Sequence, residues 1–267
     1  MEQTIICHLD AAVEQYYSGG AASGVAWATL RNDTGNDVEG SYISYCYIRC
    51  ATELADKWNL LIRGIIGFDT SVIPPLYNIL AGRIKLRSLG KNETFIGAHP
   101  LPSANIYGAT PTSTTELVAA DYSKTQDVAF SEAVHYDDWP ASGQWVTFSL
   151  NQAGLDAINK DGITFFSVKD ANYDVANISP PWEASWHPGH YGAFVYMSFA
   201  RQNHANEEYK PQLVLTLETV LSPRRTVLVE DKITLESIRN IEMAAGGRFY
   251  INEEGIAVYK SRYARNL

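Results

Sequence analysis

Flat aromatic side chains are concentrated between residues 179 and 191, where the sequence reads SPPWEASWHPGHY. Trp182, Trp186 and Tyr191 stand among prolines and a glycine, which predicts a long loop. Sugars stack their apolar C–H faces on flat aromatic rings, and loops of this kind are frequent binding sites. Two other interpretations stay open: the rings cover the edge of the core, or they pack against a neighbouring subunit. We treat Trp182, Trp186 and Tyr191 as candidate glycan-binding residues.

A second group, at residues 135–139, combines an imidazole, two carboxylates and two aromatic rings. Tyr136 and Trp139 are further candidates for stacking on a sugar, and the competing interpretation is a polar loop anchored by Trp139. Glycosidase chemistry needs two carboxylates about 5 to 9 Å apart across a cleft, and the sequence alone pairs none. The chain also has no G-x-S-x-G, Walker or H-E-x-x-H motif. We expect a non-catalytic protein.

Metal chemistry has two weak candidates. Residues 33–39 (DTGNDVE) bring several oxygen ligands of the kind that calcium prefers close together, although an Asx turn explains the same residues. His187 and His190 are separated by a proline and a glycine, and no third zinc ligand is identified. We therefore assign no metal and no cofactor, and keep a structural calcium ion at residues 33–39 as the alternative.

Composition narrows the classes of partner. The chain has 267 residues, of which 46% are hydrophobic and 12% aromatic, as suits half-buried strands. Its formal net charge of −9 lacks the basic footprint that nucleic acid or an anionic membrane surface requires. The N-terminal sequence has no basic region followed by an apolar stretch, and no window approaches about 20 apolar residues. We expect no nucleic-acid partner, no membrane insertion and no export signal.

Strand patterns dominate the first four-fifths of the chain, and turn sequences such as NDTG and KDG separate them. A short helix is expected at residues 151–159, with Asn151 as its N-cap. Strands without helices between them predict antiparallel sheets, and we expect a mainly β fold, an antiparallel β-sandwich of the jelly-roll kind. The expected strands are residues 4–9, 25–31, 41–50, 59–68, 79–89, 94–97, 105–108, 144–150, 163–169, 192–200 and 211–218.

The character of the sequence changes near residue 220. We expect a linker at residues 222–225, a strand at 226–229, a helix at 234–245 and a hairpin formed by 248–251 and 256–259. Such a segment is small for an independent core. We therefore predict a jelly-roll domain at residues 1–220 and a small α/β appendage at residues 221–267 that serves docking or assembly.

The run LIRGIIGFDTSVIP at residues 61–74 resembles the RGxIxFDTSxIP motif of DNRLRE-type jelly-roll modules, which are similar to carbohydrate-binding modules. The resemblance continues in WATLR (27–31), LVAADY (117–122), FSLNQAGLDAI (148–158) and PQLVLTL (211–217). The last strand departs from the family because Glu218 replaces its closing aromatic residue. In addition, GRFYINEEGIAVYKSR (247–262) resembles a hairpin of phage tail proteins. The resemblance implies a jelly roll from a polysaccharide-active protein or a phage tail.

Within this motif, strand alternation places Arg63, Gly67 and Asp69 on one face. Gly67 leaves room there, so we expect Arg63 and Asp69 to form a partly buried pair or to bond nearby backbone. Thr70 and Ser71 are suited to cap the following turn. The residues to which we assign a structural role are Arg63, Phe68, Asp69, Thr70, Ser71 and Pro74.

The three cysteines are expected to be free, buried thiols. On a strand, about 13 Å separates Cys46 from Cys50, and a disulfide tolerates only about 7 Å between Cα atoms. Cys7 remains an alternative partner for either of them.

We expect a non-catalytic virion or tail-associated structural or adhesion protein whose jelly roll contacts host glycans. Its expected partners are further copies of itself or other virion proteins. It would be made in the host cytoplasm and act in the virion or outside the cell without a recognisable signal peptide. The alternative is a carbohydrate-binding module of a larger polysaccharide-active protein.

Overall fold

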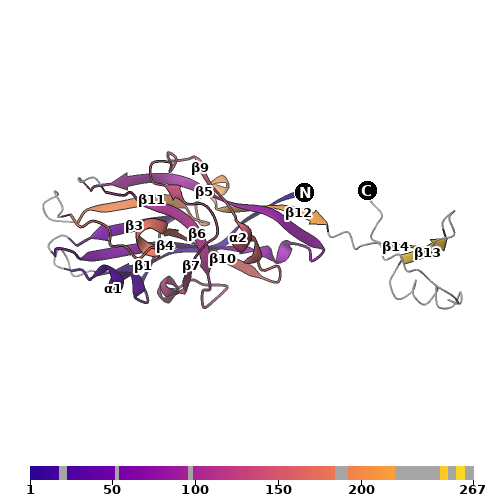
Figure 1. Cartoon of the computed structure of the whole chain (residues 1–267), viewed down its shortest axis with the longest axis horizontal. Coiled ribbons are helices and arrows are strands. Elements are labelled where there is room, and N and C mark those ends of the chain that lie inside the picture. Colours follow the sequence, from indigo (N-terminus) through magenta and orange to yellow (C-terminus); the bar gives the residue numbers. More distant parts are fainter. Residues whose placement is uncertain are drawn as a thin grey trace. The chain divides into compact units, whose positions relative to one another are not determined.

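The computed structural model describes residues 1–17, 23–51, 54–95, 99–183, 192–219, 247–251 and 257–261. The chain divides into two compact units, unit 1 (Met1–Glu218) and unit 2 (Thr219–Leu267) (Figure 1).

Unit 1 is mainly β, and its strands pair in antiparallel fashion, which confirms that part of the expected fold class. In chain order, the strands are β1 (Glu2–Tyr16), β2 (Asp37–Glu39), β3 (Ile43–Cys50), β4 (Trp58–Asp69), β5 (Tyr77–Glu93), β6 (Ser103–Ala109), β7 (Thr125–Ala129), β8 (Val134–His135), β9 (Trp145–Ser149), β10 (Ile163–Asp170), β11 (Phe194–Ala200) and β12 (Gln212–Thr219). The short helical segments are α1 (Trp27–Asn32), η2 (Thr70–Val72), η3 (Ala119–Lys124), α2 (Gln152–Asp156), η4 (Ala171–Val175) and η5 (Glu207–Tyr209).

The sheet closes on itself in the manner of a barrel. Strands β1, β12, β5, β11, β3 and β4 are neighbours in that order, and β4 pairs back with β1. A second branch leaves β4 through β10, β6 and β7. The branch is allowed because β3 pairs with the first half of β4 and β10 with the second half.

Along its length, strand β1 pairs first with β12 and then with β4. The register shifts between Cys7 and Leu9, so the bulge at His8 lies where the strand changes partner. Bulges bend a strand and increase its twist, which suits a strand that turns from one part of the sheet to another. The chain start lies beside β12 (Figure 1), where the Met1 amino group donates to the Leu217 carbonyl at 2.9 Å.

Strand β4 is the central strand, and it is buried on both faces. Ile66 and Phe68 point into one core cluster, while Leu61 and Ile65 point into a second. A strand covered on both faces reads as a continuous apolar run, and the run LLIRGIIGF fits that pattern.

Three local predictions differ from the structure. Residues 25–31 were expected to be a strand, but α1 occupies Trp27–Asn32 and buries Trp27 and Leu30. A short apolar run is compatible with a strand or a helix. Here the two buried side chains, Trp27 and Leu30, are three residues apart, which is the spacing of one face of a helix. No separate strand begins at Thr94, because β5 is continuous to Glu93; the rest of the expected strand 94–97 lies largely outside the described residues. Strands β2, β7 and β8 were not predicted.

Other local predictions are confirmed. The helix α2 begins after Asn151, whose Oδ1 accepts from the Gly154 amide at 3.0 Å. Cys7, Cys46 and Cys50 are buried free thiols, and burial raises the pKa of all three.

Unit 2 contains the expected hairpin. Strand β13 (Gly247–Ile251) pairs with β14 (Ala257–Ser261) in antiparallel register. The linker, strand, helix and turn expected at residues 222–225, 226–229, 234–245 and 252–255 lie outside the described residues. Among the helices that the structure describes, none is long and apolar enough to cross a membrane.

Candidate functional site

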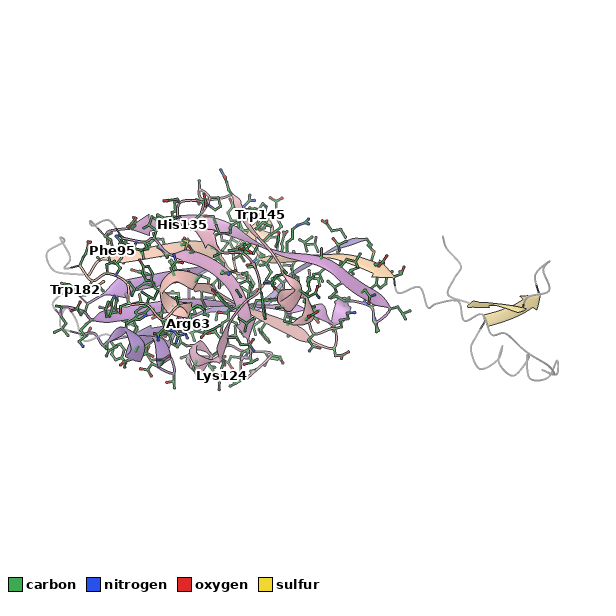
Figure 2. The ribbon with its side chains drawn as sticks, in the orientation of Figure 1. Arg63, Phe95, Lys124, His135, Trp145 and Trp182 are labelled. Carbon is green, nitrogen blue, oxygen red and sulfur yellow. The ribbon has the colours of Figure 1, made fainter. Side chains whose placement is uncertain are left out.

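The candidate site is an open pocket of about 530 Å³ in unit 1. Residues 26–28 at the start of α1 form one part of its wall, Asp56 and Trp58 form a second, and residues 177 and 179–182 form a third. Figure 2 shows that Trp182 lies at one end of the unit. Small-molecule sites typically have volumes of about 300–1,000 Å³, so the pocket is large enough for a sugar ring.

Two of the residues that line the pocket are buried tryptophans. Trp27 is 3% exposed and Trp58 is 5% exposed, and their rings meet edge to face with centroids 5.9 Å apart. Trp58 reaches this side because β4 carries an extra residue there: Arg49 is opposite Leu60, but Cys50 is opposite Trp58. The bulge moves the Trp58 ring from the side of Leu60 to that of the second core cluster.

The third ring, Trp182, comes from the segment that follows η4. It is half-buried, and its indole Nε1 donates to the Ala51 carbonyl at 3.0 Å. The Cys50 thiol also donates to the Pro181 carbonyl, at 3.6 Å. These two bonds attach residues 181–182 to the end of β3, so the ring is fixed beside the pocket.

The rim of the pocket is polar. Asp56 and Asn177 both line it, and both are exposed. Their φ values are 55° and 54°, a left-handed conformation that Asp and Asn adopt more readily than most residues. The site therefore places a carboxylate and an amide above an aromatic wall. A ring with apolar faces and a hydroxylated edge has the matching chemistry.

The indole N–H groups of Trp27 and Trp58 have no hydrogen-bond partner among the described residues. Each buried donor of this kind costs about 1–3 kcal/mol. Both nitrogen atoms are covered, so a ligand oxygen would reach them only after a small shift of the surrounding side chains. The pocket wall nevertheless contains two N–H donors that would each gain a hydrogen bond on contact with an acceptor.

Of the predicted glycan-binding residues, Trp182 lies at this pocket, and Trp186 and Tyr191 lie outside the described residues. Trp139 is 2% exposed and packs against Phe148 with centroids 6.4 Å apart, so its ring belongs to the core. Tyr136 is half-buried and lies under the Lys91 ammonium, 4.6 Å from the ring centroid. Neither Trp139 nor Tyr136 lines the pocket.

Sequence reasoning missed Trp27, Trp58, Asp56 and Asn177 as parts of one site. Trp27 was placed in an expected strand, and the bulge that turns Trp58 has no sequence pattern. The available signal was the number of tryptophans outside regular alternation, which alone does not place them together.

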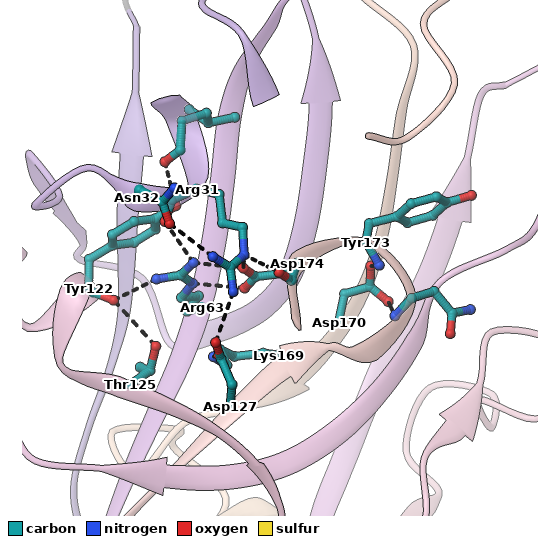
Figure 3. Close-up of polar contacts among 12 residues, drawn as sticks. Arg31, Asn32, Arg63, Tyr122, Thr125, Asp127, Lys169, Asp170, Tyr173 and Asp174 are labelled. Atoms are coloured by element: carbon teal, nitrogen blue, oxygen red, sulfur yellow. Dashed lines mark hydrogen bonds and ion pairs between the residues drawn. The ribbon is translucent and has the colours of Figure 1, made fainter. Parts of the chain in front are cut away.

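Arg63, in the run at residues 61–74, has a structural role in this fold. The Arg63 guanidinium binds both carboxylate oxygens of Asp174, at 2.8 and 2.7 Å, and lies 4.0 Å from the Tyr122 ring centroid (Figure 3). It also donates to the carbonyls of Tyr122 and Arg31, at 2.8 and 2.9 Å. These contacts join β4, α1, η3 and η4. The pair with Asp69 is not formed, and the other expected arrangement is found: Arg63 bonds backbone carbonyls, and Asp69 accepts from the Ser71 amide.

A second cation extends this network. The Lys169 ammonium is 2.6 Å from the Asp127 carboxylate, which also binds Arg31 at 2.9 Å (Figure 3). Burial lowers the pKa of Lys169, and the ion pairs with Lys169 and Arg31 hold the pKa of Asp127 below its usual value despite partial burial. Burial also raises the pKa of Asp170 to about 7, although three backbone amides donate to it.

The remaining motif residues fix the turn after β4. The Asp69 carboxylate accepts from the Ser71 amide at 3.1 Å, and the Thr70 hydroxyl binds the Gly162 carbonyl at 2.8 Å. The Pro74 carbonyl accepts from the Tyr77 amide at 3.0 Å, and Phe68 is fully buried in the first core cluster. The space above Gly67 is filled by Phe165, since a Cβ at Gly67 would lie 2.5 Å from that ring. It is therefore not available to Arg63 or Asp69.

The predicted calcium loop makes other contacts. The Asp33 carboxylate accepts from the Tyr17 hydroxyl at 2.7 Å and from the Thr34 amide at 2.8 Å. The Asn36 side chain binds the backbone of Tyr16 through both its amide and its carbonyl groups. Across the described ranges, no three His, Cys, Asp or Glu side chains are grouped closely enough to hold a metal ion.

No family model matches the chain, and no curated protein is significantly similar to it.

Proposed function

We propose that the chain is a non-catalytic adhesion protein, associated with a virion or phage tail, whose unit 1 is a jelly-roll module that binds host glycans. The proposal rests on one observation: three tryptophans from separate segments line one open pocket below a polar rim.

Trp27 and Trp58 belong to the second core cluster, so Trp182 is the ring of the pocket that is best placed to contact a ligand. Aromatic rings contribute most to stability when they are fully enclosed, and Trp182 retains an open side at the pocket. The indole N–H bond to the Ala51 carbonyl engages the edge of the ring and not its faces. Asp56 and Asn177 add oxygen and nitrogen atoms that can bind hydroxyl groups and set specificity.

The pocket offers little for hydrolysis. Among the described residues that line it, Asp56 is the single carboxylate, whereas retaining and inverting glycosidases use two. The proposed activity is therefore recognition. A single sugar pocket binds weakly, and display on several copies would raise its avidity.

The test is a glycan array probed with the full chain, followed by incubation of each retained glycan with the protein. We expect retention of a defined set of glycans and no change in their length by mass spectrometry. Absence of binding across the array would contradict the adhesion proposal. Shortening of a bound glycan would contradict the non-catalytic part.

A further inference from the structure

A second surface of unit 1 has a different chemistry from the tryptophan pocket. Strand pairing aligns rows of side chains across β2, β1, β4, β3, β11 and β5 on one face of the sheet. Directly opposite residues share a face, so each row can be read from the register. One row is Asp37, Glu14, Ile62, Tyr47, Tyr196 and Asn92. The flanking rows contain Glu39, Ala12 and Tyr45, and Tyr16, Leu60, Arg49 and Phe194.

The middle of this face is an apolar floor bordered by aromatic rings. Ala12, Leu60 and Ile62 form a separate buried cluster, against which Tyr45 and Tyr47 pack. The rings lie close together: Tyr47 is 5.5 Å from Tyr196 and 5.7 Å from Phe194, centroid to centroid. Cross-strand aromatic pairs stabilise a sheet by themselves, yet these four rings all remain partly exposed.

Three carboxylates, those of Glu14, Asp37 and Glu39, border the same face, and the rows named above contain one cation, Arg49. Glu14 is 8% exposed, and within the described part of the chain burial and three nearby charges, not a hydrogen bond, act on its carboxylate. Burial, together with Asp37 and Glu39, raises the pKa of Glu14 to about 7. Arg49 opposes that effect, and its guanidinium also binds the Asn59 side chain at 2.9 Å and lies over the Tyr16 ring.

We propose that this face, defined by Glu14, Asp37, Glu39, Tyr45, Tyr47 and Tyr196, binds a glycan that carries free amino groups. The Asp37 and Glu39 carboxylates, which outnumber the Arg49 guanidinium, select a cation, and the partly exposed rings select a flat body with apolar faces. A protonated amino sugar has both properties in one residue. Ammonium groups are also attracted to the faces of tyrosine rings, which adds to the preference over a neutral sugar.

This site is independent of the tryptophan pocket, since none of its six residues lines that pocket. It extends the proposed adhesion function by naming a ligand class, and the test below separates the two surfaces. A basic peptide would satisfy the carboxylates but not the requirement for stacked sugar rings. We therefore propose a glycan as the ligand, and equally tight binding of a basic peptide would contradict the proposal.

The experiment is a calorimetric titration of the full chain with a glucosamine oligomer in mildly acidic buffer, where the amines of the probe are protonated. The matched neutral probe is the N-acetylated oligomer of the same length. We expect the amine-bearing oligomer to bind about tenfold more tightly, because two exposed ion pairs contribute on the order of that factor. Its affinity should fall as salt is raised.

Two variants test whether the oligomer binds at this face. Asp37→Asn/Glu39→Gln should remove the preference for the amine, whereas Glu116→Gln/Glu132→Gln, which changes the net charge equally at exposed positions elsewhere, should not. Tyr47→Leu should weaken both oligomers, because it removes a ring and keeps the apolar packing. Circular dichroism checks that each variant is folded.

Three results would overturn the proposal: equal affinity for the two oligomers, an unchanged preference in Asp37→Asn/Glu39→Gln, or equally tight binding of a lysine peptide. Loss of the amine preference in Trp182→Ala alone would assign the binding to the tryptophan pocket. That outcome would refute this site and leave the proposed function standing.

Discussion

At the scale of single residues, the fold depends on a small number of buried charges. Arg63 and Asp174 form the most enclosed pair: the Asp174 side chain has no exposed area and that of Arg63 has 6%. Every polar atom of such a pair must be bonded, because an isolated buried charge is far more costly than the pair. Arg63 meets this requirement with one carboxylate and two backbone carbonyls.

Asp174→Ala should lower the free energy of unfolding by about 3–5 kcal/mol, because it leaves the Arg63 guanidinium buried without a counter-charge. Urea unfolding followed by tryptophan fluorescence measures this. Asp161→Ala, at an exposed aspartate, is the control and should change stability by less than about 0.5 kcal/mol. Equal stability of the two variants would mean that the Arg63–Asp174 pair does not hold the fold together.

Glu14 should make the protein less stable as the pH rises. Its pKa is raised from 4.5 to about 7 on folding, so the unfolded chain loses the proton first. The cost is absent below pH 4.5, grows between pH 4.5 and about 7, and is complete above that range. Glu14→Gln should therefore stabilise the protein at pH 8 by about 1–2 kcal/mol, a figure reduced for solvent screening, and should have little effect near pH 4.

Thermal melts of wild type and Glu14→Gln at the two pH values measure this difference, with Glu116→Gln as the exposed control. Asp170 also titrates near pH 7, but its contribution is common to all three proteins and cancels. A Glu14→Gln difference that does not depend on pH would contradict the assignment.

At the scale of elements, helix caps and turns are determined by residues that are adjacent in the sequence. Asn151 ends the approach to α2 by accepting from the Gly154 amide, and its side-chain amide also donates to the Ala129 carbonyl at 2.9 Å. Asn151→Ala should cost about 1–2 kcal/mol, whereas Asn151→Ser should recover most of that loss because serine is also a good cap.

The two variants are compared by urea unfolding, with Gln152→Ala, inside the same helix, as the control. If Asn151→Ala and Gln152→Ala are equally stable, the cap does not contribute.

The elements that were predictable are those with a strong local pattern. Long strands such as β4 and β10 have apolar runs or alternation, and α2 has a capping residue. Strands β2, β7 and β8 lack such a pattern because they are short and carry polar side chains at the edge of the sheet. The sequence of α1 fits a helix and a strand equally well. The burial of Trp27 and Leu30 in the folded protein favours the helix.

The candidate site was predictable only in part for a related reason. Trp182 was identified because its segment is rich in aromatic residues and prolines. Trp27 and Trp58, which lie beside it in the pocket, come from segments that are distant in the sequence. The partner of Arg63 is likewise separated from it by 111 positions, so no local spacing could identify Asp174.

At the scale of the whole molecule, unit 2 is the natural candidate for assembly. We infer this role from its size: a unit of residues 219–267 is small for an independent core and would gain stability from a partner. Adhesion by a weak sugar pocket also requires several copies to act together.

Light scattering after size exclusion of the full chain tests this inference. We expect a trimer or larger assembly, with a mass that is a multiple of 29.6 kDa. A stable monomer at high concentration would contradict self-assembly and would favour a binding module of a larger polysaccharide-active protein.

The central claim, that the tryptophan pocket binds glycans, is tested most directly by titrating a glycan retained on the array into Trp182→Ala and Trp145→Ala. Trp145 lies well away from Trp182 (Figure 2) and is a half-buried ring beside Lys85 and Arg87, so it controls for the loss of an indole. We predict that Trp182→Ala weakens binding about thirtyfold, the effect of removing a ring worth roughly 2 kcal/mol, and that Trp145→Ala leaves it unchanged. Equal affinities of wild type and Trp182→Ala, with both variants folded, would contradict the claim.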